Sequence, residues 1–430
     1  MAASRSLAGW LDFIERQHPQ AIALGLERVA QVKARLGAAI RCPVITVGGT
    51  NGKGSICAML EAMLRAAGYR TGMYSSPHLL RYNERVRIDA REANDGPLCT
   101  AFEAVERARG EVPLTYFEYG TLAALWLFAD ARLDALVLEV GLGGRLDAVN
   151  IVDPDCAVLA SVGIDHVEYL GPTREAIGAE KAGIFRSSRP AVVADPDPPR
   201  SVIGHAKSIG ARLLLIGADF GYLREAGQWT YWGPQGRRNA LAHPALRGAM
   251  QLRNAAAALC ALDTLHDRLP VAMQEVRTGL AEAKLPGRFQ VLPGRPQIVL
   301  DVAHNPQAAA TLAENLAASG FARETIAVFG MLRDKDIGGV IRAVTARVTR
   351  WHLASLPGTR GAQAAELSAQ LRAAGVSAPV TEHDSPASAF AAARKEATED
   401  DKILIFGSFL TVGDVMARLE AERNGAARHG

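Results

Sequence analysis

Short apolar runs alternate with amphipathic stretches along most of the chain, a pattern typical of α/β proteins. The β-branched run Val44–Val47 follows a proline and predicts a buried strand. Apolar residues then recur at helical spacing over Ile56–Ala67, so a helix is expected to begin near Lys53. Four glycines occur where the strand should end and the helix begin. Strand, glycine-rich loop and helix in this order predict a phosphate-binding loop.

The segment Gly49–Ser55, called the phosphate loop below, carries the groups that phosphate oxygens need. Its glycines let backbone amides approach an anion, the helix N-terminus attracts negative charge, and Lys53 supplies a cation for the β- and γ-phosphates. The pattern departs from the standard P-loop, because no glycine stands five residues before Gly52 and Gly54 separates the lysine from the serine. The alternative is a glycine-rich turn with a solvent-facing lysine; nucleotide binding is the favoured prediction.

Polar residues also follow two later apolar runs. Leu136–Val140 contains one acid, Glu139, close to its expected carboxyl end, and Cys156–Val162 is soon followed by Asp165 and His166. In parallel α/β sheets, ligands bind outside the carboxyl ends of the strands. These side chains are therefore expected to face the same site as the phosphate loop.

A second α/β pattern begins after a segment rich in proline and glycine. We predict an N-terminal nucleotide-binding domain over 1–286, an irregular linker over 287–296 and a smaller C-terminal domain over 297–430. Both domains are expected to be doubly wound α/β folds. A segment bearing Trp and Tyr after Ile216 predicts a small β insertion.

Composition narrows the class of protein. With 430 residues, 49% hydrophobic and 22% charged residues and a net charge of +3, the chain is typical of a two-domain soluble protein rather than a nucleic-acid binder. Its five cysteines are scattered without metal-binding spacing, which suits a reducing cytoplasm. No apolar stretch of eighteen residues or signal peptide occurs. We expect a cytoplasmic monomer that acts on small molecules, with no nucleic-acid or membrane partner.

Six motifs in one order resemble the folylpolyglutamate synthase/dihydrofolate synthase branch of the Mur ligase superfamily, over almost the full chain. They are Gly49–Ser55, Tyr74–His78, Glu139–Asp147, Asp165–His166, Glu180–Ile184 and Asp301–Pro306. The resemblance implies a P-loop ATPase-like domain of the Mur ligase central type, followed by a Rossmann-like domain of the Mur ligase C-terminal type. It also implies an amide-forming ligase: ATP phosphorylates a carboxylate of dihydropteroate or a tetrahydrofolate, and the amine of L-glutamate displaces the phosphate.

The resemblance also assigns roles to residues. The implied catalytic residues are Lys53, Glu139, His166 and Lys181, the last as a carbamate, and the implied ligands of Mg²⁺ are Ser76, Glu139 and His166. Because an imidazole offers nitrogen, Mn²⁺ should also be accepted, and K⁺ is a further expected activator. The implied ATP-binding residues are Thr50, Asn51, Gly52, Lys53, Gly54, Ser55, Asn254, Arg288, Asp301 and His304. The implied pterin-substrate residues are Ala23, Leu24, Gly25, Leu26, Leu146, Asp147 and Ala148.

Other interpretations stay open for single residues and for the whole chain. Glu139 alone fits a salt-bridged acid, and Asp301–Asn305 fits a strand-to-helix connection in which Asn305 caps a helix at Pro306. The alternative functions are a folylpolyglutamate synthase without the first activity, a peptidoglycan-precursor ligase and a P-loop ATPase that couples hydrolysis to motion. Against the peptidoglycan ligase stands the sequence of Gly52–Ser55, where those enzymes resemble Gly-Lys-Thr-Thr.

Overall fold

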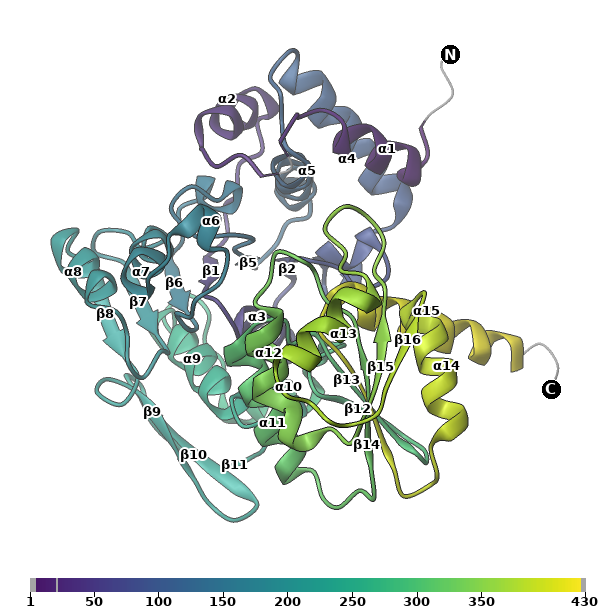
Figure 1. The fold of residues 1–430 in the computed structure, drawn as a ribbon. Coiled ribbons are helices and arrows are strands. Elements are labelled where there is room, and N and C mark those ends of the chain that lie inside the picture. The colour runs from purple at the N-terminus through teal and green to yellow at the C-terminus, as the bar shows by residue number, and fades with distance from the viewer. Residues whose placement is uncertain (1–4, 21, 427–430) are drawn as a thin grey trace. The chain divides into compact units, whose positions relative to one another are not determined.

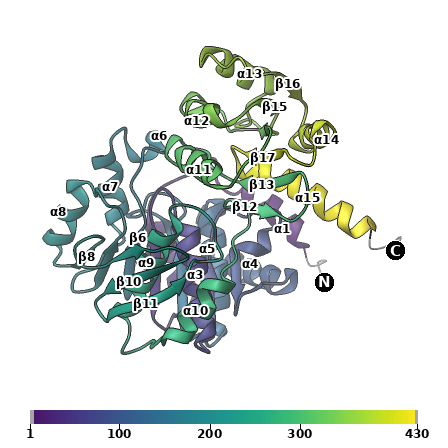
Figure 2. The same ribbon diagram turned by 90° about the horizontal axis from the view of Figure 1, so that it is seen from below.

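The computed structural model describes residues 5–20 and 22–426, and these fall into two compact units (Figures 1 and 2). The first unit comprises the chain up to His78, Tyr82–Ala245 and Leu252–Lys284. The second comprises Leu79–Arg81, Leu246–Gln251 and the chain from Leu285 onward. Both units are α/β, which confirms the predicted fold class.

The first unit contains an eight-stranded sheet in the order β4-β3-β2-β5-β1-β6-β7-β8. Pairing is parallel from β2 to β8, while β3 and β4 add an antiparallel edge. The predicted strands at the centre are confirmed; the two antiparallel edge strands were not anticipated. The strands are β1 Val44–Gly48, β2 Thr71–Tyr74, β3 Val86–Ile88, β4 Arg91–Glu92, β5 Ala135–Glu139, β6 Cys156–Leu159, β7 Pro190–Val193 and β8 Arg212–Leu215.

Two groups of helices pack on one face of this sheet, because the strand residues that they contact lie in register on the same side of β1. Residues of α1, α2, α4 and α5 share one apolar core with Leu136 and Leu138 of β5. Residues of α7 and α8 share another with Leu159 of β6 and Val193 of β7. The helices are α1 Leu7–Glu15, α2 Glu27–Leu36, α3 Lys53–Ala66, α4 Asp95–Arg109, α5 Tyr116–Asp130, α6 Val167–Leu170, α7 Arg174–Ala182, α8 Arg200–Ser208, α9 Gln251–Thr264 and α10 Met273–Glu282, with 3₁₀ turns at Tyr82–Arg85 and Ala148–Ile151.

The predicted β insertion is confirmed as a separate three-stranded antiparallel sheet. It consists of β9 Gly221–Arg224, β10 Gln228–Gly233 and β11 Gly236–Ala242. Trp229 and Tyr231 of the central strand β10 are fully buried, and the Tyr231 hydroxyl donates to Asp263 of α9 at 2.6 Å. The insertion is therefore packed onto the first unit rather than extended from it.

The second unit has a six-stranded sheet in the order β12-β13-β17-β14-β15-β16, parallel except for β12. Alternate residues of β17 enter two cores, Leu404 with helices α11, α12 and α13 and Ile405 with α14 and α15, so this sheet is doubly wound as predicted. The elements are β12 Gln290–Leu292, β13 Gln297–Asp301, α11 Pro306–Ala318, β14 Thr325–Phe329, α12 Ile337–Val344, a 3₁₀ turn Thr345–Arg347, β15 Arg350–Ala354, α13 Ala364–Ala373, β16 Val380–His383, α14 Pro386–Glu396, β17 Lys402–Phe406 and α15 Phe409–Ala426.

The segment 287–296 is not the irregular linker that its prolines and glycines suggested. Gln290–Leu292 forms strand β12, which pairs antiparallel with β13 and extends the edge of the second sheet. The prolines and glycines flank this short strand, where they do not interrupt its pairing. In the described part of the chain, no helix is both long enough and apolar enough to cross a membrane.

Helix packing in the first unit depends on one small residue in α10. A Cβ added at the buried Gly279 would lie 2.5 Å from Cα of Met63 in α3, so the two helix backbones are in contact there. Gly279→Ala should therefore destabilise the protein by about 1–3 kcal/mol, measured as a lower Tm. The matched control is Gly204→Ala in α8, an exposed position with open space around the added Cβ. It should leave Tm unchanged or raise it; equal losses in both variants would contradict this account.

Candidate active site

The phosphate loop lies between β1 and α3, as predicted, and two of its glycines are required by geometry. Gly49 has φ +138°, and a Cβ there would lie 3.0 Å from the backbone nitrogen of Ser161. Gly52 has φ +96°, and a Cβ there would lie 2.8 Å from Oδ1 of Asn254 in α9. The loop therefore touches a helix about two hundred residues further along the chain. This contact brings the predicted ATP-binding residue Asn254 to the loop.

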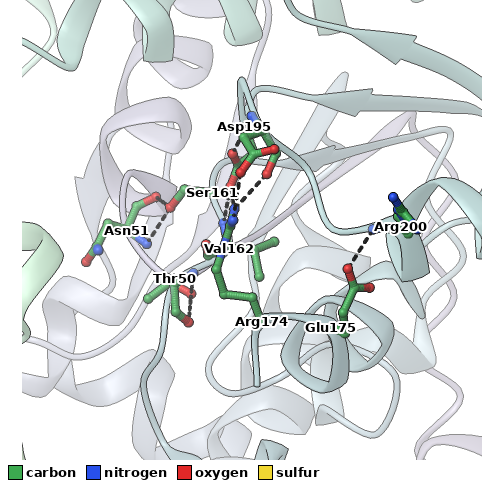
Figure 3. A network of polar contacts seen from close by, with 10 residues as sticks. Thr50, Asn51, Ser161, Val162, Arg174, Glu175, Asp195 and Arg200 are labelled. Atoms are coloured by element: carbon green, nitrogen blue, oxygen red, sulfur yellow. Dashed lines mark hydrogen bonds and ion pairs between the residues drawn. The ribbon is translucent and has the colours of Figure 1, made fainter. Parts of the chain in front are cut away.

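The segment that follows β6 holds the phosphate loop from its other side (Figure 3). The Thr50 N–H donates to the Ser161 carbonyl at 2.8 Å, and the Asn51 N–H donates to the Ser161 hydroxyl at 3.1 Å. That hydroxyl donates to the Asn51 carbonyl at 3.0 Å, and the Thr50 hydroxyl bonds both the N–H and the C=O of Gly163. Ser161 and Gly163 thus shape the loop, although the sequence did not single them out.

Two lysine amines meet at one carbonyl of the loop. Nζ of Lys53 donates to the Gly49 carbonyl at 3.0 Å, and Nζ of Lys181 donates to the same oxygen at 3.2 Å. Lys53 is half-buried and its amine bonds carbonyls of the loop, which favours the predicted phosphate loop over a solvent-facing lysine. Lys181 in α7 is buried; this burial, with the nearby charge of Lys53, lowers its pKa to about 7. Two amines therefore lie against one carbonyl of the loop, and that of Lys181 is shielded from water.

A loop after β5 packs against the helix that carries Lys181. A Cβ at Gly144 would lie 2.8 Å from the Lys181 carbonyl, and the side chain of Asn150 donates to the carbonyls of Arg145 and Gly183, both at 3.0 Å. The buried Asp147 accepts hydrogen bonds from two backbone amides of this loop, and its burial raises its pKa to about 6. These contacts position the predicted substrate residue Asp147 and Lys181 together.

Of the three predicted metal ligands, the structure brings Ser76 and Glu139 together. Glu139 is buried at the end of β5, and its Oε2 accepts from the Ser76 N–H at 3.3 Å. His166 caps α6 with φ +51°, and its Nε2 lies 3.9 Å from the carboxylate of Asp165. Among the described residues, no group of three or more His, Cys, Asp or Glu side chains could hold a metal alone. The predicted donor set suits a divalent cation whose remaining ligands are water molecules or phosphate oxygens.

The two predicted pterin-substrate segments lie side by side. The Gly25 N–H donates to the Leu146 carbonyl at 3.4 Å, although the two residues are far apart in the sequence. Arg28, at the start of α2, donates to the Ala23 carbonyl at 2.8 Å and to the buried Glu118 of α5 at 2.8 Å. The Arg28–Glu118 pair therefore fixes the segment Ala23–Leu26 from α5. No pattern in the sequence predicts this pairing.

The three predicted ATP-binding residues of the second unit also lie close to one another. The guanidinium of Arg288 lies 5.1 Å from the ring centroid of Phe409, and the ring of His304 lies 6.1 Å from the same ring. Asp301, at the end of β13, accepts from the N–H groups of Phe289 and Ala303, both at 2.8 Å. The pKa of Asp301 is raised overall, because burial raises it more than the charge of Arg288 lowers it. Asn305 caps α11 as predicted, accepting from the Ala308 N–H at 2.9 Å.

Comparison with known families identifies the class of protein. Residues 47–262 match the Mur ligase middle domain, and residues 287–409 match the Mur ligase, glutamate ligase domain. The two matches follow the two sheets in order. This fold with a phosphate loop defines an ATP-dependent ligase of the Mur type.

Individual relatives narrow the class. The chain is 46% identical over 424 residues to the dihydrofolate synthase/folylpolyglutamate synthase of Escherichia coli K12, covering 98% of each chain, and 40% identical to that of Haemophilus influenzae, covering 98% and 99%. The structure of E. coli FolC in complex with DHPP and ADP matches with a TM-score of 0.93 at 46% identity, over 98% and 99% of the chains. A bifunctional folylpolyglutamate synthase/dihydrofolate synthase with Mn, AMPPNP and L-glutamate bound matches with a TM-score of 0.89 at 45% identity, over 96% and 98% of the chains. The chain belongs to the dihydrofolate synthase/folylpolyglutamate synthase family of Mur ligases.

Proposed function

We propose that this ligase is bifunctional: it adds L-glutamate to dihydropteroate and to tetrahydrofolate and its polyglutamates, through an acyl phosphate. The observation that carries the proposal is the contact between Gly25 and Leu146, which joins the two segments that resemble the pteroate-binding segments of bifunctional relatives. A carboxylate is a poor electrophile until one of its oxygens becomes a leaving group, and a transferring phosphoryl group needs cations around it. Lys53 on the phosphate loop provides one such charge.

For the ligands of ATP and metal we propose the roles that the family resemblance implies. We propose that the phosphate loop and Asn254 of the first unit bind ATP. Arg288, Asp301 and His304 of the second unit are also proposed as ATP-binding residues. Ser76, Glu139 and His166 would hold the divalent cation, which supplies positive charge to the phosphoryl group when bound. Oxygen donors favour Mg²⁺ and the imidazole favours Mn²⁺, the metal named with a matching bifunctional enzyme. Activation by K⁺ remains a prediction.

We further propose that the protein works as a cytoplasmic monomer on small molecules alone, without nucleic acid or membrane. The small net charge of +3 argues against a nucleic-acid partner, because a protein that binds nucleic acid would need a strongly basic surface. All five cysteines are free, which suits a reducing compartment.

The proposed function is tested by following amide products with purified protein, ATP, Mg²⁺ and L-glutamate. Dihydropteroate and tetrahydrofolate should each give a product heavier by one glutamyl residue, with release of phosphate, whereas a muramyl peptide precursor should give none. Elongation of tetrahydrofolate without any product from dihydropteroate would identify a folylpolyglutamate synthase alone. Phosphate release at the full rate without glutamate would instead identify an ATPase.

The same assay tests the assigned phosphate and metal contacts. Lys53→Ala and Glu139→Ala should each reduce kcat by at least about a hundredfold, because each removes charge from the phosphoryl-transfer site. Circular dichroism and Tm should show that both variants remain folded. Wild-type kcat in either variant would mean that the site is misplaced.

The Arg28–Glu118 pair predicts a selective effect on the pterin substrate. Arg28→Met removes the hydrogen bonds to Ala23 and Glu118, so KM for dihydropteroate should rise roughly tenfold while KM for ATP stays unchanged. Arg35→Met is the matched control, since Arg35 also lies in α2 and donates to backbone carbonyls, those of Ala108 and Arg109. Equal effects of the two variants on KM for dihydropteroate would refute the positioning role of Arg28.

Lys181 is proposed to carry a carbamate in the active enzyme. The reaction adds CO₂ to the neutral amine and releases a proton, giving an anionic oxygen donor near the metal ligands. Because burial lowers the pKa of Lys181 to about 7, much of the amine is neutral near neutral pH. As the pH falls through 7 the amine becomes protonated, so the carbamate and the activity should both be lost.

Activity in CO₂-depleted buffer should therefore drop and return on addition of bicarbonate, with an acidic limb near pH 7. Lys181→Ala should be inactive and partly rescued by a small carboxylic acid. A fully active Lys181→Arg variant would contradict the carbamate, because arginine keeps the positive charge and cannot form it.

A further inference from the structure

The short segment after β6 has two sides with different partners. Ser161 and Gly163 bond the phosphate loop, whereas the residue between them, Val162, turns its backbone groups the other way. The Val162 N–H donates to Oδ2 of Asp195 at 2.7 Å, and the Val162 carbonyl accepts from Nε of Arg174 at 3.0 Å. Alternation of this kind is expected of extended backbone, in which successive residues face opposite sides.

Asp195 and Arg174 bind each other as well as Val162, and we call the pair the Val162 clamp. NH2 of Arg174 lies 3.5 Å from Oδ2 of Asp195. Arg174 also reaches Asp197, donating to its carbonyl at 2.6 Å and to its carboxylate at 2.9 Å. Asp195 is buried just after β7 and Arg174 begins α7, so the clamp ties together two elements beside β6 (Figure 3).

We propose that Arg174 and Asp195 are positioning residues for ATP. The Val162 clamp holds Ser161 and Gly163 in the positions from which they shape the phosphate loop. Neither residue of the clamp bonds the loop directly in the contacts described above. They act on the loop through Val162, whose backbone N–H and carbonyl are both held by hydrogen bonds. If the segment shifts, the hydrogen bonds to Thr50 and Asn51 lengthen, and these bonds weaken steeply with poor geometry.

The clamp should therefore affect nucleotide binding more than the other substrates. The inference rests on the proposed function only in taking the phosphate loop as the site of the ATP phosphates. Asp195→Asn keeps the shape of the side chain but removes the charge that pairs with Arg174. We expect the Kd for ADP and the KM for ATP to rise about tenfold. The KM values for dihydropteroate and glutamate should change by less than about twofold.

A matched control distinguishes positioning from general stability. Asp263 is also a buried acid of the first unit, and it pairs with Arg238 at 3.0 Å beside the β insertion rather than beside the phosphate loop. Asp263→Asn should lower Tm at least as much as Asp195→Asn while leaving the Kd for ADP unchanged. A role of Asp195 in stability alone predicts that the two variants behave alike.

The deciding measurement is calorimetric titration of the full chain with ADP and Mg²⁺, supported by steady-state kinetics. Wild-type affinity for ADP in Asp195→Asn would overturn the proposal. If that variant does not fold, Arg174→Lys replaces it. Lysine keeps the positive charge but has no Nε to donate to the Val162 carbonyl. Wild-type affinity for ADP in Arg174→Lys would also overturn the proposal. A wild-type chain that binds ADP but forms no amide would refute the proposed function and leave the clamp testable. A wild-type chain that does not bind ADP would refute both.

Discussion

The hydrogen bonds between the phosphate loop and the end of β6 are the constraint on which the site depends. A loop that leaves a buried strand has backbone groups that need partners, and here Ser161 and Gly163 provide them for Thr50 and Asn51. The glycines at 49 and 52 make this close approach sterically allowed. The loop therefore takes its shape from a neighbouring strand end as well as from its own sequence.

Around that loop the protein places charge where water is scarce. Lys53 and Lys181 share the Gly49 carbonyl, and the packing of the 141–148 loop on α7 keeps Lys181 out of solvent. Burial, and after it the nearby charge of Lys53, raises the energy of the protonated Lys181 amine, which is why its pKa falls. The same surroundings favour a group that brings negative charge, whether a phosphate or a carbamate. Burial and charge together thus prepare the site for phosphoryl transfer.

The sequence predicted most of the fold because buried parallel strands appear as short apolar runs, as β1, β5 and β6 show. It did not reveal β3, which has only three residues, or β4, whose two residues are charged and exposed, or β12, which lies among prolines and glycines. Within the site, the sequence motifs predicted the phosphate loop, Glu139 and Lys181. Ser161, Asp195 and the Arg28–Glu118 pair act through contacts between distant segments, and a single sequence carries no periodic signal for such contacts.

The central claim is that the site around Lys53 and Glu139 transfers the γ-phosphoryl group of ATP to a substrate carboxylate. Labelling the carboxylate oxygens of dihydropteroate with ¹⁸O tests it most directly, because an acyl phosphate must pass one of those oxygens to phosphate when glutamate attacks. The account predicts one ¹⁸O atom in each phosphate released, detected by mass spectrometry, in amounts equal to the amide formed. Unlabelled phosphate accompanying amide formation would contradict it.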